Sequence, residues 1–319
     1  ANNEAEIPEA LRDRLEIVRL SGYYPHEKLQ IAGKYLLPRI CERTGVKLDE
    51  RVSFPDDVIT QVMRGWTREA GVRELERTLE NTVRHRAKEI VMGKKFKAEI
   101  TDKQLQEYLG APRFLDSQLP EPGRPGVVTG LAWTSVGGEI LPIECMLLSG
   151  KGQLIMTGKL GDVMKESAQI AVSLVRERLQ RYDIDPAIVK KTDIHIHVPE
   201  GAVPKDGPSA GIALTLCLLS AFIRQPVPPD VAFTGEVSLT GACLPIGGLN
   251  EKALAALQAG VKVLRLPAQN QKDVDELPLP AKKGLKIYTH KHIDEIIKVL
   301  FKGSKPDAEK QVAKATKKK

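Results

Sequence analysis

The sequence predicts a small, mostly helical domain followed by an α/β (α+β) domain that contains a mixed sheet. The first prediction rests on apolar residues that recur at helical spacing between residues 1 and 110. The second rests on strand-like and helix-like segments that alternate from 126 to 302. Between them, residues 111–125 are rich in proline and show no periodicity, which predicts a linker.

The helices of the first domain are expected because apolar residues recur at intervals of three and four. The longest stripe consists of Leu75, Leu79, Val83, Ala87, Ile90 and Val91. Two short extended runs, around Val52 and at 98–100, are candidates for pairing. The expected helices are 8–17, 26–41, 55–64, 72–92 and 101–109, the last with Thr101 or Asp102 as its N-cap.

The sheet of the second domain is expected to be mixed, because two of its strands form a hairpin that turns at Gly137-Gly138. The expected strands are 127–136, 139–147, 153–157, 193–198, 231–234, 237–244, 261–266 and 285–288. The expected helices are 162–182, 212–223, 250–259 and 293–301. In the first of these helices, the residues expected to face the core are Val163, Ile170, Leu174, Val175 and Leu179.

The net charge of +7 is concentrated at the C-terminal end. Between 302 and 319, seven lysines stand against Asp307 and Glu309, so the rest of the chain is nearly neutral. We expect 303–319 to be a solvated, disordered tail, with weak non-specific DNA binding as the less favoured alternative. Aromatic residues make up 4% of the chain, which argues against platforms for stacked bases.

The cysteines indicate a reducing, intracellular setting. Cys41, Cys145, Cys217 and Cys243 lie far apart, and no two of them form a CxxC pair. Neither a disulfide framework nor a zinc site is therefore expected. The chain shows no signal peptide and no apolar run long enough to span a membrane, so a soluble protein without a membrane partner is expected.

Ser209 is the leading candidate for a nucleophile. It lies in Lys205-Asp206-Gly207-Pro208-Ser209-Ala210-Gly211, directly before an apolar run from Ile212 to Ile223. A helix that is apolar all round is buried, and its first turn presents unpaired N–H groups and the positive end of the helix dipole. That setting suits a nucleophile beside an oxyanion hole. The plain alternative is that Ser209 only caps the helix.

Lys252 offers a base for this serine. If Asn250 caps the helix that follows, Lys252 lies in the first turn, where the dipole disfavours a positive charge. Burial would lower the lysine pKa further, toward ~7–8, where a lysine can act as a general base. The alternative is an exposed lysine at the start of a surface helix.

Thr234 and Asp206 are candidates for supporting roles. Thr234 ends a strand directly before Gly235, so its hydroxyl can bind a neutral lysine amine. Asp206 precedes Ser209 by three positions and can orient the site or add charge near the helix N-terminus. A local hydrogen bond at a strand end or in a turn is the plainer explanation for each.

His195 and His197 share one face of a strand, opposite Ile194, Ile196 and Val198. Such a pair can bind a metal, but no third ligand at suitable spacing is evident, so no metal site is predicted. A serine–histidine hydrolase is the better rival use of these residues. The favoured role is structural, or one of shaping the site from nearby.

These residues resemble the Lon protease family. The matching segments are 205–211, Thr234-Gly235-Glu236, Gly247 to Lys252, Trp133 to Gly138 and 157–167, together with 11–16, 20–23 and 67–77 of the first domain. The resemblance covers about residues 1 to 301 and implies the Lon protease fold, preceded by the helical lid of an AAA+ ATPase. It further implies an ATP-dependent serine endopeptidase with a Ser209–Lys252 dyad, whose lysine is hydrogen-bonded by Thr234.

By the same resemblance, the protein would form a homo-hexameric ring that degrades misfolded and regulatory proteins in the bacterial cytoplasm or the mitochondrial matrix. Arg73 would sense nucleotide in the lid, Arg14 would be the arginine finger, and Asn2 would be the nucleotide-sensing asparagine. The glycines at 158–161 match neither GxGxxG nor GxxxxGK[ST]. ATP and Mg²⁺ are therefore expected only in the full-length protein, and no cofactor is expected for peptide hydrolysis. The rival from another class is a non-catalytic ring scaffold or a nucleic-acid-binding module.

Overall fold

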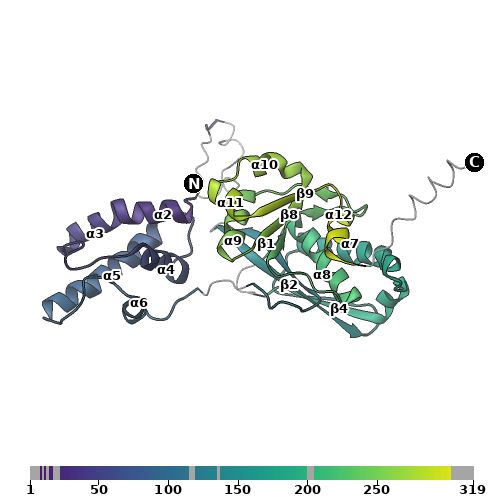
Figure 1. Ribbon diagram of the computed structural model, residues 1–319, viewed down its shortest axis with the longest axis horizontal. Helices are drawn as coiled ribbons and strands as arrows, with labels where there is room; N and C mark the ends of the chain where they lie inside the picture. The colour runs from purple at the N-terminus through teal and green to yellow at the C-terminus, as the bar shows by residue number, and fades with distance from the viewer. Residues whose placement is uncertain are drawn as a thin grey trace, which may run out of the picture. The chain divides into compact units, whose positions relative to one another are not determined.

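A computed structural model of the chain divides into two compact units, Ala1–Leu115 and Asp116–Lys319 (Figure 1). It describes residues 8, 11, 14–16, 22–114, 119–134, 137–199 and 205–302. Most of the helix expected at 8–17 and all of the tail at 303–319 lie outside the described residues. No helix in the described ranges combines the length and the apolarity that a bilayer span requires.

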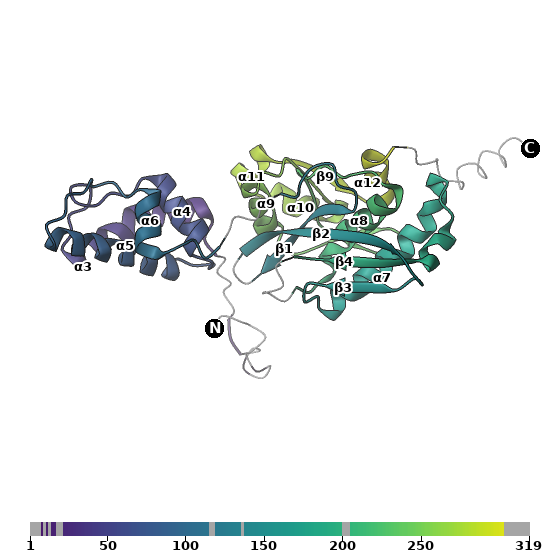
Figure 2. The same cartoon turned by 90° about the horizontal axis from the view of Figure 1, so that it is seen from below.

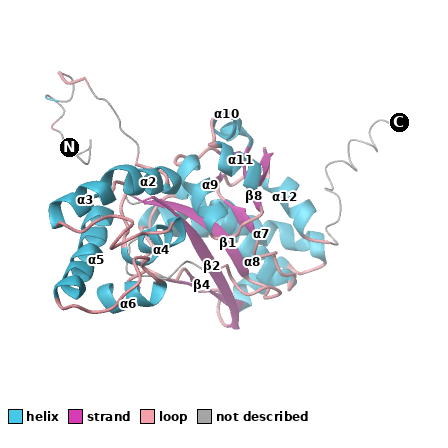
Figure 3. Ribbon diagram, turned by 60° about the vertical axis from the view of Figure 1, so that its left-hand side comes forward, coloured by secondary structure: helices cyan, strands magenta, loops and turns pink. Residues whose placement is uncertain are grey.

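The first unit is built from helices joined by loops (Figure 3). They are α2 (Pro25–Ile31), the π-helical η2 (Ala32–Leu36), α3 (Leu37–Thr44), α4 (Asp56–Trp66), α5 (Arg73–Val91) and α6 (Asp102–Leu109). Thr101 is the N-cap of α6, as one of the two expected alternatives. The expected pairing of the two extended runs is confirmed as a parallel bridge between Ser53 and Glu99.

One apolar core holds the first unit together. Leu75, Leu79 and Val83 on α5 are at most 1% exposed and pack in the same cluster as Ile40 of α3. Val91 was expected to extend this stripe, and that expectation is wrong, because Val91 is 87% exposed. It is the last residue of α5 and lies beyond the residues of that helix that enter the core.

The second unit contains a seven-stranded sheet in the order β3-β4-β2-β1-β5-β8-β9. The sheet is mixed, as predicted. The strands are β1 (Val127–Thr134), β2 (Gly137–Ser149), β3 (Leu154–Thr157), β4 (Thr192–His197), β5 (Val231–Phe233), β8 (Val263–Pro267) and β9 (Lys286–His290). The β1–β2 hairpin and the β2–β4 pair are antiparallel, and the other neighbours are parallel. Figure 2 shows β1, β2, β4 and β3 side by side.

Helices cover both faces of this sheet. On one face lie α7 (Asp162–Arg178, continued by the 3-10 turn Leu179–Tyr182), α8 (Gly211–Ile223) and α12 (Ile293–Leu300), which share a single core with the sheet. On the other face, α9 (Leu249–Gln258) approaches β2 at Gly138, whose side of the strand is opposite to that of Leu141 and Ile143. The sheet therefore separates α8 from α9.

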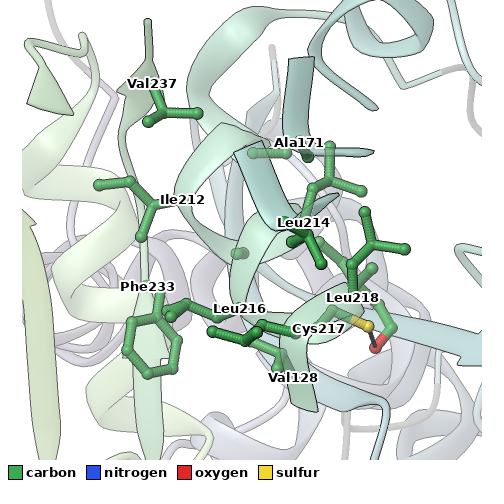
Figure 4. Packing of buried hydrophobic residues seen from close by; sticks show 14 of the residues in the cluster. Val128, Ala171, Ile212, Leu214, Leu216, Cys217, Leu218, Phe233 and Val237 are labelled. Carbon is green, nitrogen blue, oxygen red and sulfur yellow. Dashed lines mark hydrogen bonds between the residues drawn. The ribbon is translucent and has the colours of Figure 1, made fainter. Parts of the chain in front are cut away.

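The apolar α8 lies at the centre of the unit (Figure 4). Eleven of its 13 residues are buried, which explains why its sequence shows no polar face. Cys217 is among them: its thiol donates to the Gly126 carbonyl over 3.1 Å, and burial raises its pKa well above the ordinary value. It acts as a small core residue, not as a reactive thiol.

Four details of the second unit differ from expectation. Gly137 and Gly138 do not form the turn of the hairpin but begin β2, where they pair with Thr134 and Trp133. The strand expected at 237–244 is a ribbon of two short antiparallel strands, β6 (Glu236–Val237) and β7 (Cys243–Leu244), because Gly241 turns the chain with φ +90°. Val163 is 42% exposed, since it lies in the first turn of α7 on the solvent side. The short helices α10 (Gln271–Asp275) and α11 (Leu279–Gly284) were not predicted.

Candidate active site

Lys252 projects from the first turn of α9. The N-cap of this helix is Gly248, with φ +68°, and the expectation that Asn250 is the cap is wrong. The backbone N–H of Lys252 donates to the Gly248 carbonyl over 3.1 Å and so closes the first turn. Lys252 is only 3% exposed, an unusual position for a lysine.

The lysine amine is hydrogen-bonded to a threonine hydroxyl. Lys252 Nζ donates to Thr234 Oγ1 over 3.3 Å. Burial lowers the pKa of Lys252 to about 8, against a smaller opposing influence of the Glu251 carboxylate. Roughly a tenth of the amine is therefore neutral at pH 7, far more than of a free lysine, and the neutral state is the one that a general base requires.

Thr234 directly follows β5, and its side chain is fully buried. Its backbone N–H donates to the Arg265 carbonyl over 3.2 Å, which continues the pairing of β5 with β8 by one residue. The sheet therefore fixes the hydroxyl to which the lysine amine binds.

Ser209 lies in the 3-10 turn Pro208–Ala210 that leads into α8, and it is half-buried. Its carbonyl accepts from the Gly235 N–H over 2.8 Å, and the Gly235 carbonyl accepts from the Ile212 N–H over 3.0 Å. A Cβ at Gly235, whose φ is +151°, would lie 2.3 Å from Ile212 Cδ1, so this close approach requires glycine. Ser209 and Lys252 are thereby both attached to the dipeptide Thr234-Gly235.

Asp206 is attached to a different helix from the one that was expected. Its Oδ1 accepts from the Met164 N–H over 3.0 Å and from the Gly207 N–H over 2.9 Å. A Cβ at Gly161 would lie 2.3 Å from Asp206 Cγ, so the carboxyl group packs closely on the start of α7. Asp206 therefore caps α7 and anchors the loop before Ser209, and its charge lies at the N-terminus of α7.

His195 and His197 lie on one face of β4, while Ile194 and Ile196 are buried on the other. Their hydrogen bonds go to Thr157 Oγ1, over 3.0 Å from His195 Nε2 and 2.7 Å from His197 Nδ1. Within the described ranges, no group of three or more His, Cys, Asp and Glu side chains is arranged to hold a metal ion.

The nucleotide roles expected of Arg73, Arg14 and Asn2 stay predictions. Arg73 is the first residue of α5 and is exposed, and Arg14 is exposed as well. Asn2 lies outside the described residues.

One residue that supports the site was missed from the sequence. Asn270 is 2% exposed, and its amide donates to the Ile246 carbonyl over 2.8 Å and accepts from the Ile246 N–H over 3.1 Å. It thus holds the loop that leads into α9. Nothing in the local sequence of a lone asparagine distinguishes such a role from that of a turn residue.

Comparison with known proteins shows which family models and which proteins the chain matches. Residues 99–303 match the family model of the Lon protease (S16) C-terminal proteolytic domain, and residues 42–100 match that of the Lon protease AAA+ ATPase lid domain. The chain is 46% identical over 306 residues to a Lon protease of Lawsonia intracellularis and 47% identical over 305 residues to Lon protease 1 of Bacillus subtilis. These alignments each cover 96% of the chain but only 37% and 39% of the two relatives.

Proposed function

The chain belongs to the Lon protease family, and from this premise we propose that its second unit is a serine endopeptidase with Ser209 as nucleophile and Lys252 as general base. The observation that carries the proposal is the hydrogen bond of the buried Lys252 amine to Thr234 Oγ1, next to the Gly235 that holds Ser209. A lysine with a pKa of about 8 can take up a proton from a serine hydroxyl and release it within one turnover.

In the proposed reaction, Lys252 Nζ takes the proton of Ser209 as its Oγ attacks the peptide carbonyl. The tetrahedral intermediate then collapses, the C–N bond breaks, and the Lys252 ammonium gives its proton to the leaving amine. Water attacks the acyl ester in the second half, again with Lys252 as base, and the proton returns to Ser209 Oγ. Thr234 keeps the amine in place through both halves.

The negative oxygen of the intermediate needs donors that exist before the substrate arrives. The N–H groups of Ser209 and Ala210 lie in the first turn before α8, where no preceding turn provides acceptors. The positive end of the α8 dipole adds to their effect. Pro208 has no N–H, and the Gly207 N–H donates to Asp206, so these two residues are poorly suited to the task.

For the whole protein we propose ATP-dependent degradation of misfolded and regulatory proteins by a homo-hexameric ring in the cytoplasm. This proposal is supported by membership of the family. The chain spans little more than a third of the length of the two relatives compared above. Arg73, Arg14 and Asn2 would act on ATP and Mg²⁺ in that ring. The chemistry at Ser209 and Lys252 requires neither, so no step of the proposed reaction involves nucleotide.

Hydrolysis of a short fluorogenic peptide without ATP tests the proposal. We expect activity that Ser209→Ala and Lys252→Met each abolish while both variants remain folded. The rivals predict other outcomes: a serine–histidine hydrolase would lose activity in His195→Ala or His197→Ala and retain it in Lys252→Met. A non-catalytic scaffold or nucleic-acid-binding module would show no peptidase activity, and its DNA binding would weaken steeply with salt.

A further inference from the structure

The end of the β1–β2 hairpin lies against the first turn of α9. Trp133 and Gly138 are cross-strand partners there. A Cβ at Gly248 would lie 2.9 Å from Trp133 Cγ, so the indole rests directly on the N-cap residue of α9. A Cβ at Gly138 would lie 2.1 Å from the Glu251 carbonyl oxygen and 2.9 Å from the Lys252 nitrogen.

These two contacts fall at the two ends of one hydrogen bond. The Lys252 N–H donates to the Gly248 carbonyl over 3.1 Å, and this bond closes the first turn of α9. Trp133 contacts the residue that accepts, and Gly138 lies against the Glu251–Lys252 peptide group, whose N–H donates. Because the hairpin strands belong to the central sheet, their backbone sets where the Cα of Lys252 lies.

We propose that Trp133 and Gly138 are positioning residues for Lys252, which hold the first turn of α9 so that the lysine amine stays beside Thr234. The inference rests on the proposed role of Lys252 as general base. A lysine reaches its target through a flexible four-carbon stem, so the side chain alone does not fix the amine. The position of the helix turn must supply the precision, and a misplacement of about 1 Å can cost about 10²-fold in rate.

The exposure of Trp133 supports this assignment. The side chain is 59% exposed, so burial in a core does not account for a tryptophan here. Its contact with Gly248 gives the ring a local function. Asn270 holds the loop before α9 through Ile246, whereas the hairpin contacts the first turn itself.

Gly138→Ala tests the proposal most sharply, because the new methyl group meets backbone atoms that cannot rotate away. We expect kcat on a short fluorogenic peptide to fall by about 10²-fold, with KM changed less than about threefold. Gly247→Ala is the matched control, since a Cβ there meets no atom within 4 Å, and it should leave both constants within about twofold of wild type.

A second readout does not depend on activity. NMR titration of protein labelled with ¹³C-lysine should give a Lys252 pKa of about 8 in the wild type and in Gly247→Ala. In Gly138→Ala the displaced turn admits water, and we expect the pKa of Lys252 to rise toward the ~10.4 of free lysine. Trp133→Ala should shift it the same way, and Trp133→Phe should restore most of the wild-type value, because a ring again covers Gly248.

Unchanged kcat and unchanged Lys252 titration in folded Gly138→Ala and Trp133→Ala would overturn the proposal. If Gly138→Ala fails to fold, the Trp133→Ala and Trp133→Phe pair decides it alone. Lys252→Met, measured in parallel, distinguishes a failure of the proposed general base from a failure of the proposed positioning by the hairpin. If that variant keeps wild-type activity, the proposed base is wrong, whereas the titration still reports whether the hairpin positions the lysine.

Discussion

Lys252 Nζ donates to Thr234 Oγ1 over 3.3 Å, although one residue comes from the first turn of α9 and the other from the end of β5. Both side chains are almost completely buried. A buried amine whose hydrogen-bond partner is a neutral hydroxyl is destabilised as a cation, which is the physical reason for its lowered pKa.

Thr234→Val removes the hydroxyl and keeps the shape of the side chain. We expect kcat to fall by about tenfold, because a buried polar group without its partner loses about 1–3 kcal/mol. The matched control is Thr129→Val, since Thr129 is 1% exposed, lies on β1 beside β5 and donates to the Pro229 carbonyl. This control should cost stability and leave kcat unchanged; an equal loss of kcat in both variants would contradict a specific role for Thr234.

Lys252→Met should stabilise the fold at neutral pH. The folded pKa of Lys252, about 8, lies below the ~10.4 of an unfolded chain, so between these values the unfolded state binds more protons and wild-type stability rises with pH. Below pH 8 the buried lysine costs about 3 kcal/mol, which the substitution removes.

Urea unfolding of the wild type and Lys252→Met at pH 7 and pH 10 measures this difference. The advantage of the methionine variant should shrink by about 2–3 kcal/mol between the two pH values. An advantage that does not change with pH would mean that Lys252 is not buried as an amine.

The pH dependence of kcat/KM reports the base in the free enzyme. We expect activity to rise with pH through about 8, because Lys252 acts only when it is neutral. The rising limb should stay there in His195→Gln and His197→Gln. A limb near the ~6.5 of free histidine, lost in one of these variants, would favour the serine–histidine rival.

Asp206→Ala should reduce the stability of the fold and leave the pKa of Lys252 unchanged. The Asp206 carboxylate caps α7 through the Met164 N–H, and the loss of such a cap costs about 1 kcal/mol. We expect a lower urea midpoint and a rising limb of the pH–rate profile that stays near 8. A shifted limb with unchanged stability would place Asp206 in the electrostatics of Lys252 instead.

Much of this architecture could be predicted from local patterns. The uniform apolarity of 212–223 predicts a buried helix, and the alternation around Ile194 and Ile196 predicts a strand with one buried face. The ribbon at 236–244 could not be distinguished from one strand, because its turn depends on Gly241 within an otherwise strand-like run.

The site was harder to predict than the fold, because its geometry depends on segments that lie far apart in the sequence. Lys252 in an isolated α9 would be an ordinary first-turn lysine. In the folded protein the hairpin packs on that turn, and Thr234, from the end of β5, binds the amine. The attachment of Asp206 to α7 links residues 42 positions apart, and no local pattern encodes that link.

The Ser209–Lys252 dyad can be tested by reaction of the protein with a fluorophosphonate, which phosphonylates an activated serine with loss of fluoride. Peptide mass spectrometry should locate the label on Ser209, and the labelling rate should rise with pH through about 8. In Lys252→Met, labelling should be slower by at least about 10²-fold, the range that a positioned general base contributes. A label on another residue, or equal labelling rates in the wild type and Lys252→Met, would contradict the dyad.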